Sequence, residues 1–178
     1  MLGLAAGVLL SGCDSAGLDA AAPTAVAPTT TAAAPTKAPV TTTPKPAPTR
    51  PAVTVDGPCP YADRATVMDI IGQHLDRTTV TSTTPHPGCA FYRPNAEKAA
   101  EIAVSVLPTA AAAQARALAL PGKGANPVGT VADGGTVAIT AGGAVLAVSK
   151  GAALVVVRIN QRISLEAVEI AKLVAAKI

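Results

Sequence analysis

Residues 136–159 read TVAITAGGAVLAVSKGAALVVVRI, and this stretch decides the fold class. It contains three runs of β-branched and small apolar residues, at 136–140, 144–149 and 154–159. Gly142-Gly143 and Lys150-Gly151 separate these runs, and short glycine-containing connections are typical of tight hairpin turns. The stretch therefore predicts a meander of three antiparallel strands.

Three further β-prone runs lie upstream, at 78–84, 89–93 and 102–107, and we expect them to pair as neighbouring strands. A first helix is predicted after Asp63, a residue type favoured at helix N-termini, and it ends at Gly72. A second helix is predicted over Ala110–Leu120, where alanine gives high helix propensity and Pro121 stops the helix.

The last helix is predicted over Ser164–Ile178, with Ser164 as its cap, glutamates in its early turns and lysines late. One face of this helix is apolar, formed by Ala167, Ile170, Ala171, Val174, Ala175 and Ile178. The elements together predict an α+β fold over residues 57–178: an antiparallel sheet of about six strands, in three-strand, helix, three-strand order, with N-terminal, middle and C-terminal helices packed on it.

The N-terminus predicts export and lipid anchoring. Residues 2–10 form an apolar run of signal-peptide length, too short for a membrane-spanning helix of about twenty residues. The run ends in Leu10-Ser11-Gly12-Cys13, which resembles a bacterial lipobox, so we expect residues 1–12 to be a signal peptide and Cys13 to carry the lipid. A basic residue before the apolar run is missing, so we expect Met1 to be a late or truncated start. The alternative is a chance cysteine after an Ala/Leu-rich segment.

Residues 13–56 are predicted to form a disordered tether. They consist largely of Ala, Pro and Thr and show no apolar periodicity. Such a segment has too little to bury and is expected to stay extended, on the order of 100 Å at most. Its Pro-flanked threonines also resemble O-glycosylated stalks.

Export determines how the other two cysteines are interpreted. Cys59 and Cys89 form an even pair in an oxidising compartment, which predicts a disulfide between them. A metal site or a redox pair is the alternative, but the two thiols lack CxxC spacing, and His74 and His86 show no ligand pattern with them. We therefore expect no metal.

Charge and motifs narrow the function classes. Residues 57–178 carry eleven basic and eight acidic side chains, a surplus too small for a nucleic-acid partner. The G-x-S-x-G motif of one hydrolase class is missing, and Gly122-Lys123-Gly124 lacks the spacing of a phosphate-binding loop and is interpreted as a turn. We expect a protein that is not an enzyme and needs no cofactor.

Two segments are candidate recognition surfaces. Tyr92 and Arg93 close the run that contains the only phenylalanine of the chain, and Asn160, Gln161 and Arg162 form a polar triplet before the last helix. The alternatives are core packing around the disulfide for the first segment and a solvated connection for the second.

A combination of motifs resembles actinobacterial envelope lipoproteins that carry a domain of unknown function. The motifs are Leu-Ser-Gly-Cys, the Pro/Thr linker, Pro-Cys-Pro-Tyr at 58–61, Gly-Cys-Ala-Phe-Tyr-Arg-Pro at 88–94, Val-Ser-Lys-Gly at 148–151 and the closing Ile-Ala-Lys-Leu-Val helix at 170–174. The resemblance covers about 57–178 and implies an α+β architecture and a Cys59–Cys89 bridge. It implies no activity.

These observations predict a membrane-tethered binding or interaction module on the outer face of the cell membrane. Its partner would be an envelope protein, lipid or polysaccharide. The alternative is a carrier or sensor of an apolar envelope ligand such as a lipid, held in a cavity between sheet and helices. An enzyme is the third hypothesis.

Overall fold

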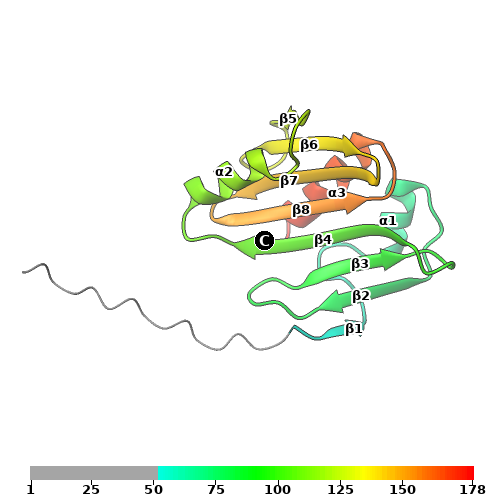
Figure 1. The fold of residues 1–178 in the computed structure, drawn as a ribbon. Helices are drawn as coiled ribbons and strands as arrows, with labels where there is room; N and C mark the ends of the chain where they lie inside the picture. Colours follow the sequence, from blue (N-terminus) through cyan, green and yellow to red (C-terminus); the bar gives the residue numbers. More distant parts are fainter. Residues whose placement is uncertain (1–51) are drawn as a thin grey trace, which may run out of the picture. The chain divides into compact units, whose positions relative to one another are not determined.

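A computed structural model describes residues 52–178, which form an α+β fold (Figure 1). Cys13 and most of the expected tether lie outside the described residues. The elements in chain order are β1 (Thr54–Asp56), α1 (Arg64–Ile71), β2 (Arg77–Thr81), β3 (Gly88–Tyr92), β4 (Lys98–Val106), α2 (Ala110–Ala119), β5 (Asn126–Val128), β6 (Gly135–Thr140), β7 (Gly143–Lys150), β8 (Ala153–Ile159) and α3 (Ser164–Ala175).

All strands belong to one antiparallel sheet with the spatial order β1-β2-β3-β4-β8-β7-β6-β5. The meander predicted from residues 136–159 is confirmed as β6-β7-β8, and the three upstream runs are confirmed as the neighbours β2, β3 and β4. The two hairpin turns lie one residue from their predicted places, at Ala141-Gly142 and Gly151-Ala152. The two halves of the sheet join where β4 pairs with β8 over seven residues.

The sheet has eight strands and not about six, so the predicted element order is wrong at two places. The additional strands, β1 and β5, are the two edges, and each is only three residues long. β5 contains Pro127, which argues against a central strand but is tolerated at an edge, where no neighbour needs its missing N–H. β1 lies in the segment 13–56 that we expected to be tether, so the sheet begins before residue 57.

The helix boundaries follow the predictions except in α3, which starts at Ser164 as predicted but has a different cap residue and ends at Ala175, before the predicted Ile178. Asp63 caps α1, since its carboxylate accepts a hydrogen bond of 2.9 Å from the backbone N–H of Thr66, and Gly72 ends the helix with φ 60°. Ser164 is not the cap of α3: the cap position is Ile163, and no side chain bonds the first turn there. None of the helices within residues 52–178 is long and apolar enough to cross a membrane.

One face of the sheet is covered by α1 and α3, and the main core lies between these two helices and the sheet (Figure 1). The predicted apolar face of α3 is confirmed, except that Ile178 lies beyond the helix and is only partly buried. The interior side chains are almost inaccessible to solvent; the largest with an exposed fraction under 2% are Phe91, Ile71, Leu75, Ile102, Leu146 and Ile170. This layer is filled by side chains.

The opposite face is covered by α2 alone, and only over β6, β7 and β8. Ala117 of α2 packs on Ala147 and Val156, so small side chains let the helix approach the strands closely. The buried hydroxyl of Thr136 on β6 donates a hydrogen bond of 2.8 Å to the carbonyl of Ala117. The half of this face formed by β1, β2, β3 and β4 has no helix over it in the described part of the chain.

The predicted disulfide between Cys59 and Cys89 is present, with the two Cα atoms 5.7 Å apart. Cys59 precedes α1 and Cys89 lies in β3, so the bond ties the segment entering the first helix to the sheet. Both residues are buried in the main core.

We expect the double variant Cys59→Ala/Cys89→Ala to lower the free energy of unfolding by about 3–4 kcal/mol, because a crosslink across about thirty residues restricts the unfolded chain. Denaturant unfolding of this variant and of the oxidised wild type measures the difference. Wild-type protein reduced in denaturant is the control, because it loses the disulfide bond but keeps both sulfur atoms. Equal unfolding midpoints for the variant and the oxidised protein would contradict the prediction.

Candidate functional site

The uncovered half of the sheet carries a row of threonines. Side chains alternate between the two faces of a strand, so Thr79 and Thr81 of β2 point to the same face, away from α1 and α3. Thr54 on β1 lies opposite Thr81, and their hydroxyl oxygens are 2.8 Å apart. Thr83 and Thr84 follow in the loop between β2 and β3. Hydroxyls therefore gather at one side of this face.

These threonines line a groove of about 550 Å³, which we call the threonine groove. Its floor includes Gly88 and Ala90 of β3, and Ala103 and Ser105 of β4 form the side toward the middle of the sheet. Small side chains at these floor positions keep the surface hollow. The groove lies on the outside of the sheet and not between the sheet and a helix.

One end of the groove carries charged and aromatic side chains from three neighbouring strands. Arg77 on β2 is paired with Tyr92 on β3, and its guanidinium carbon lies 4.4 Å from the centroid of the ring. Tyr92 is paired with Lys98 on β4, whose ammonium lies 3.3 Å from the carboxylate of Glu101. The Arg77 guanidinium is attracted to the face of the ring, and Tyr92 forms an aromatic wall at this end of the groove.

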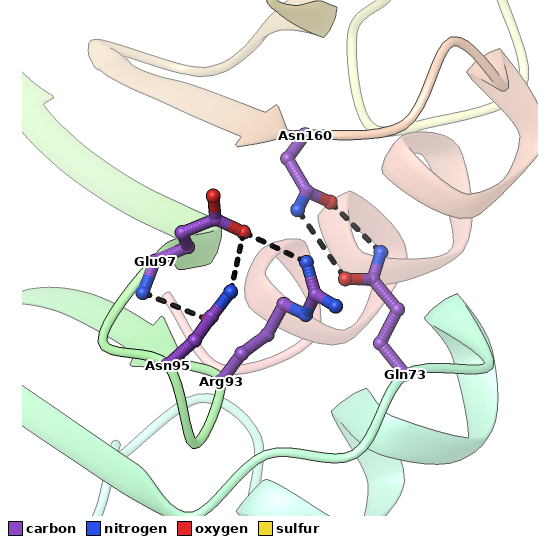
Figure 2. Close-up of polar contacts among 5 residues, drawn as sticks. All are labelled: Gln73, Arg93, Asn95, Glu97 and Asn160. Carbon is purple, nitrogen blue, oxygen red and sulfur yellow. Dashed lines mark hydrogen bonds and ion pairs between the residues drawn. The ribbon is translucent and has the colours of Figure 1, made fainter.

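The turn between β3 and β4 forms a second polar site. Arg93 and Glu97 close this turn, with a guanidinium nitrogen 2.8 Å from a carboxylate oxygen. The side-chain amide of Asn95 donates a hydrogen bond of 2.9 Å to the same carboxylate oxygen and accepts one of 3.2 Å from the backbone N–H of Glu97. Three side chains within five residues therefore hold one another in place (Figure 2).

A pair of amides lies beside this turn and joins two distant segments. Gln73, just after α1, and Asn160, just after β8, bond each other reciprocally at 2.8 and 3.3 Å. Figure 2 shows the five side chains, from three segments, turned toward one common region. A cavity of about 460 Å³, which we call the turn pocket, is lined by Gly72, Gln73, His74, Arg93, Pro94 and Asn95.

The predicted recognition residues divide between these sites. Tyr92 lines the threonine groove, whereas Arg93 lines the turn pocket and Asn160 lies beside it. Arg162 is exposed on the connection to α3, as expected for a solvated loop. Gln161 is half-buried, so the structure does not present all five residues as one surface.

The side chain of Gln161 is turned partly inward. Its carbonyl oxygen Oε1 and the carboxylate oxygen Oε2 of Glu166 are both buried, and neither has a hydrogen-bond partner among the described residues. Burial raises the pKa of Glu166, because removal from water disfavours the charged carboxylate. The polar triplet 160–162 therefore contains residues in three different environments.

The sequence analysis did not identify the threonines of the groove or the residues that surround Arg93 as site residues. A signal for the first was available, since the run Thr-Thr-Val-Thr-Ser-Thr-Thr at 78–84 places alternate hydroxyls on one face of a strand. A signal for the turn site was also available, because the opposite charges of Arg93 and Glu97 flank the turn-forming residues Pro94 and Asn95. Nothing local predicts Gln73, which lies 87 residues from its partner.

The metal-ligating residue types are dispersed in the described part of the chain. Within residues 52–178, no group of three or more His, Cys, Asp or Glu side chains is arranged to hold a metal ion. His74 lines the turn pocket, and His86 lies in the loop between β2 and β3. The segment Gly122-Lys123-Gly124 forms turns, as predicted.

The chain belongs to a protein family described as "Domain of unknown function (DUF2020)", whose model matches residues 38–178. Comparison with curated proteins gives no match. Membership agrees with the part of the sequence resemblance that concerns a domain of unknown function. The lipoprotein part of that resemblance stays a prediction.

The reciprocal amide bonds predict energetic coupling between Gln73 and Asn160. We expect a double-mutant cycle with Gln73→Ala and Asn160→Ala to give a coupling of about 0.5–1.5 kcal/mol in the free energy of unfolding, the usual contribution of such hydrogen bonds. Denaturant unfolding of the two single variants and the double variant measures it. Strictly additive effects of the two substitutions would show that the pair contributes no coupling.

Proposed function

We propose that this protein is a lipid-anchored binding module of the cell envelope that holds its ligand in the threonine groove and does not convert it chemically. The observation that carries the proposal is the unequal covering of the sheet. Two helices cover one face, whereas α2 covers only part of the other and leaves a groove of about 550 Å³. A hollow of this size on a rigid sheet is typical of a ligand site.

The lining of the groove combines threonine hydroxyls with apolar residues of β4, Ile102, Val104 and Val106, and the hydroxyls suit a ligand with polar groups. Each threonine hydroxyl both donates and accepts hydrogen bonds, so the lining can match hydroxyls, amides or carbonyls of a ligand. The Tyr92 ring adds one flat apolar contact at the end of the groove, next to the Lys98–Glu101 ion pair. These features support a polysaccharide or an extended peptide of the envelope as the partner.

The filled core favours a binding module over the alternative, a carrier of an apolar ligand such as a lipid. Ile71, Phe91 and Ile170, between the sheet and its two helices, have exposed fractions of 1% or less. A lipid chain would need a cavity in this layer, because the free energy of binding hydrocarbon is most favourable where its surface is fully removed from water. The threonine groove lies instead on the outer face of the sheet, where hydroxyls form part of its lining.

The anchor and the tether complete the proposal. Diacylation of Cys13 would hold the protein stably at the outer face of the membrane, since two acyl chains bind far more firmly than one. The Ala/Pro/Thr-rich segment before β1 would let the domain reach material well above the lipid surface. The disulfide between Cys59 and Cys89 fits an oxidising compartment outside the cytoplasm.

We expect Ala90→Arg to weaken binding to actinobacterial cell walls at least tenfold, because a long side chain on the floor of the threonine groove occupies the space of the ligand. Cosedimentation of residues 52–178 with walls stripped of protein measures binding. The matched control is Ala141→Arg, which adds the same charge in the exposed turn between β6 and β7. Equal loss in both variants, or no loss in Ala90→Arg, would contradict the groove as the binding surface.

The anchor is tested separately by Cys13→Ala in the full chain. We expect the variant to leave the membrane fraction, because the thioether-linked lipid can no longer form. Cell fractionation followed by mass spectrometry of the N-terminal peptide measures the change. Firm retention of the variant in the membrane would contradict the assignment of Cys13.

A further inference from the structure

We infer that the turn pocket is a binding site for a single carboxylate group, with Arg93 as the residue that recognises it. This site is separate from the threonine groove: of the consecutive residues Tyr92 and Arg93, the first lines the groove and the second lines the turn pocket. The inference rests on the hydrogen-bond capacity, charge and size of the pocket. It does not depend on what the groove binds.

The hydrogen bonds within the pocket leave mainly donors available. A guanidinium carries five N–H donors, and only the nitrogen Nη1 of Arg93 is bonded to another described residue. Each amide of Gln73 and Asn95 uses one N–H for a neighbour and keeps the second. Their carbonyl oxygens already accept a hydrogen bond, from Asn160 and from the backbone of Glu97 respectively. The unused N–H groups outnumber the other free hydrogen-bonding groups of these amides, so they favour a ligand that accepts hydrogen bonds.

The charge of the pocket selects a weakly charged acceptor. Arg93 contributes one positive charge, and Glu97 balances it at 2.8 Å. A ligand with several negative charges, such as a phosphate ester, would meet the Glu97 carboxylate, and Arg93 is the one permanently charged cation among the residues that line the pocket. A single carboxylate matches the planar guanidinium, which binds such groups through two parallel hydrogen bonds.

Glu97 competes with the ligand carboxylate for Arg93. Its carboxylate occupies Arg93 when no ligand is bound, and Asn95 holds it in position. The two side chains are 40% and 62% exposed, so the pair can open without disturbing the core. A ligand carboxylate competes with the Glu97 carboxylate for the N–H groups of Arg93. It must either replace Glu97 there or bind the guanidinium together with it. Removal of the Glu97 charge should therefore strengthen binding.

A peptide C-terminus and a sugar acid are two sources of such a carboxylate. The cavity of about 460 Å³ is in the range of small-molecule sites and accepts either. Neutral analogues that lack only the charge distinguish recognition of the carboxylate from contact with the rest of the ligand.

The test is an NMR titration of the full chain with two matched pairs of probes: N-acetyldialanine against its C-terminal amide, and glucuronate against glucose. We expect saturable shifts of the side-chain amide signals of Gln73 and Asn95 with at least one carboxylate and with neither neutral partner. The tighter of the two carboxylates identifies the source. Added salt should weaken binding, since an exposed ion pair is screened.

Three variants make the inference specific. Glu97→Gln should bind the carboxylate at least threefold more tightly, Arg93→Gln should lose binding, and Glu97→Gln/Arg93→Gln should not recover it. Arg93→Lys keeps the positive charge and serves as the folding control, and a dispersed NMR spectrum is required of every variant. Absence of saturable shifts with both carboxylates, equal binding of the neutral partners, or weaker binding by Glu97→Gln would each overturn the inference.

Discussion

A ten-residue helix cannot cover one face of an eight-stranded sheet, and the exposed half of this molecule follows from that constraint. At about 1.5 Å per residue α2 is about 15 Å long, whereas eight strands about 4.8 Å apart span about 34 Å. The other face has two helices, α1 and α3. One half of one face must therefore meet water. The side chains there have to tolerate that exposure, and the exposed Thr54 and the half-buried Thr81 do so while keeping a high β propensity, whereas Thr79 is buried.

The position of α2 determines which half stays open. Its buried alanines allow it to lie close to β6, β7 and β8, and Thr136 binds the carbonyl groups near its C-terminal end. On the open side, the floor of the groove is backed by the main core, where Phe91 and Ile102 are fully buried and the disulfide reaches Cys89. A hollow backed by so well-packed a core would keep its shape before the proposed ligand binds, and a preformed site would lower the entropic cost of that binding.

The sequence predicted the parts of the fold that depend on local patterns. Alternating apolar runs and glycine turns identified the central strands, and the cap at Asp63 follows from local hydrogen bonding. The edge strands were missed, because three residues give no pattern and Pro127 argues against a strand. The site was predicted only in part: Tyr92, Arg93 and Asn160 were identified, but the contact of Asn160 with Gln73 depends on tertiary packing between segments far apart in the chain.

The central claim is that the open half of the sheet is the surface that meets the envelope. Site-specific photo-crosslinking on intact cells tests it directly, with the photoreactive residue at Thr81 in the groove or at the half-exposed Leu118 on α2. The account predicts a discrete crosslinked adduct from position 81 and none from position 118. Adducts from position 118 alone, or equal adducts from both positions, would contradict it.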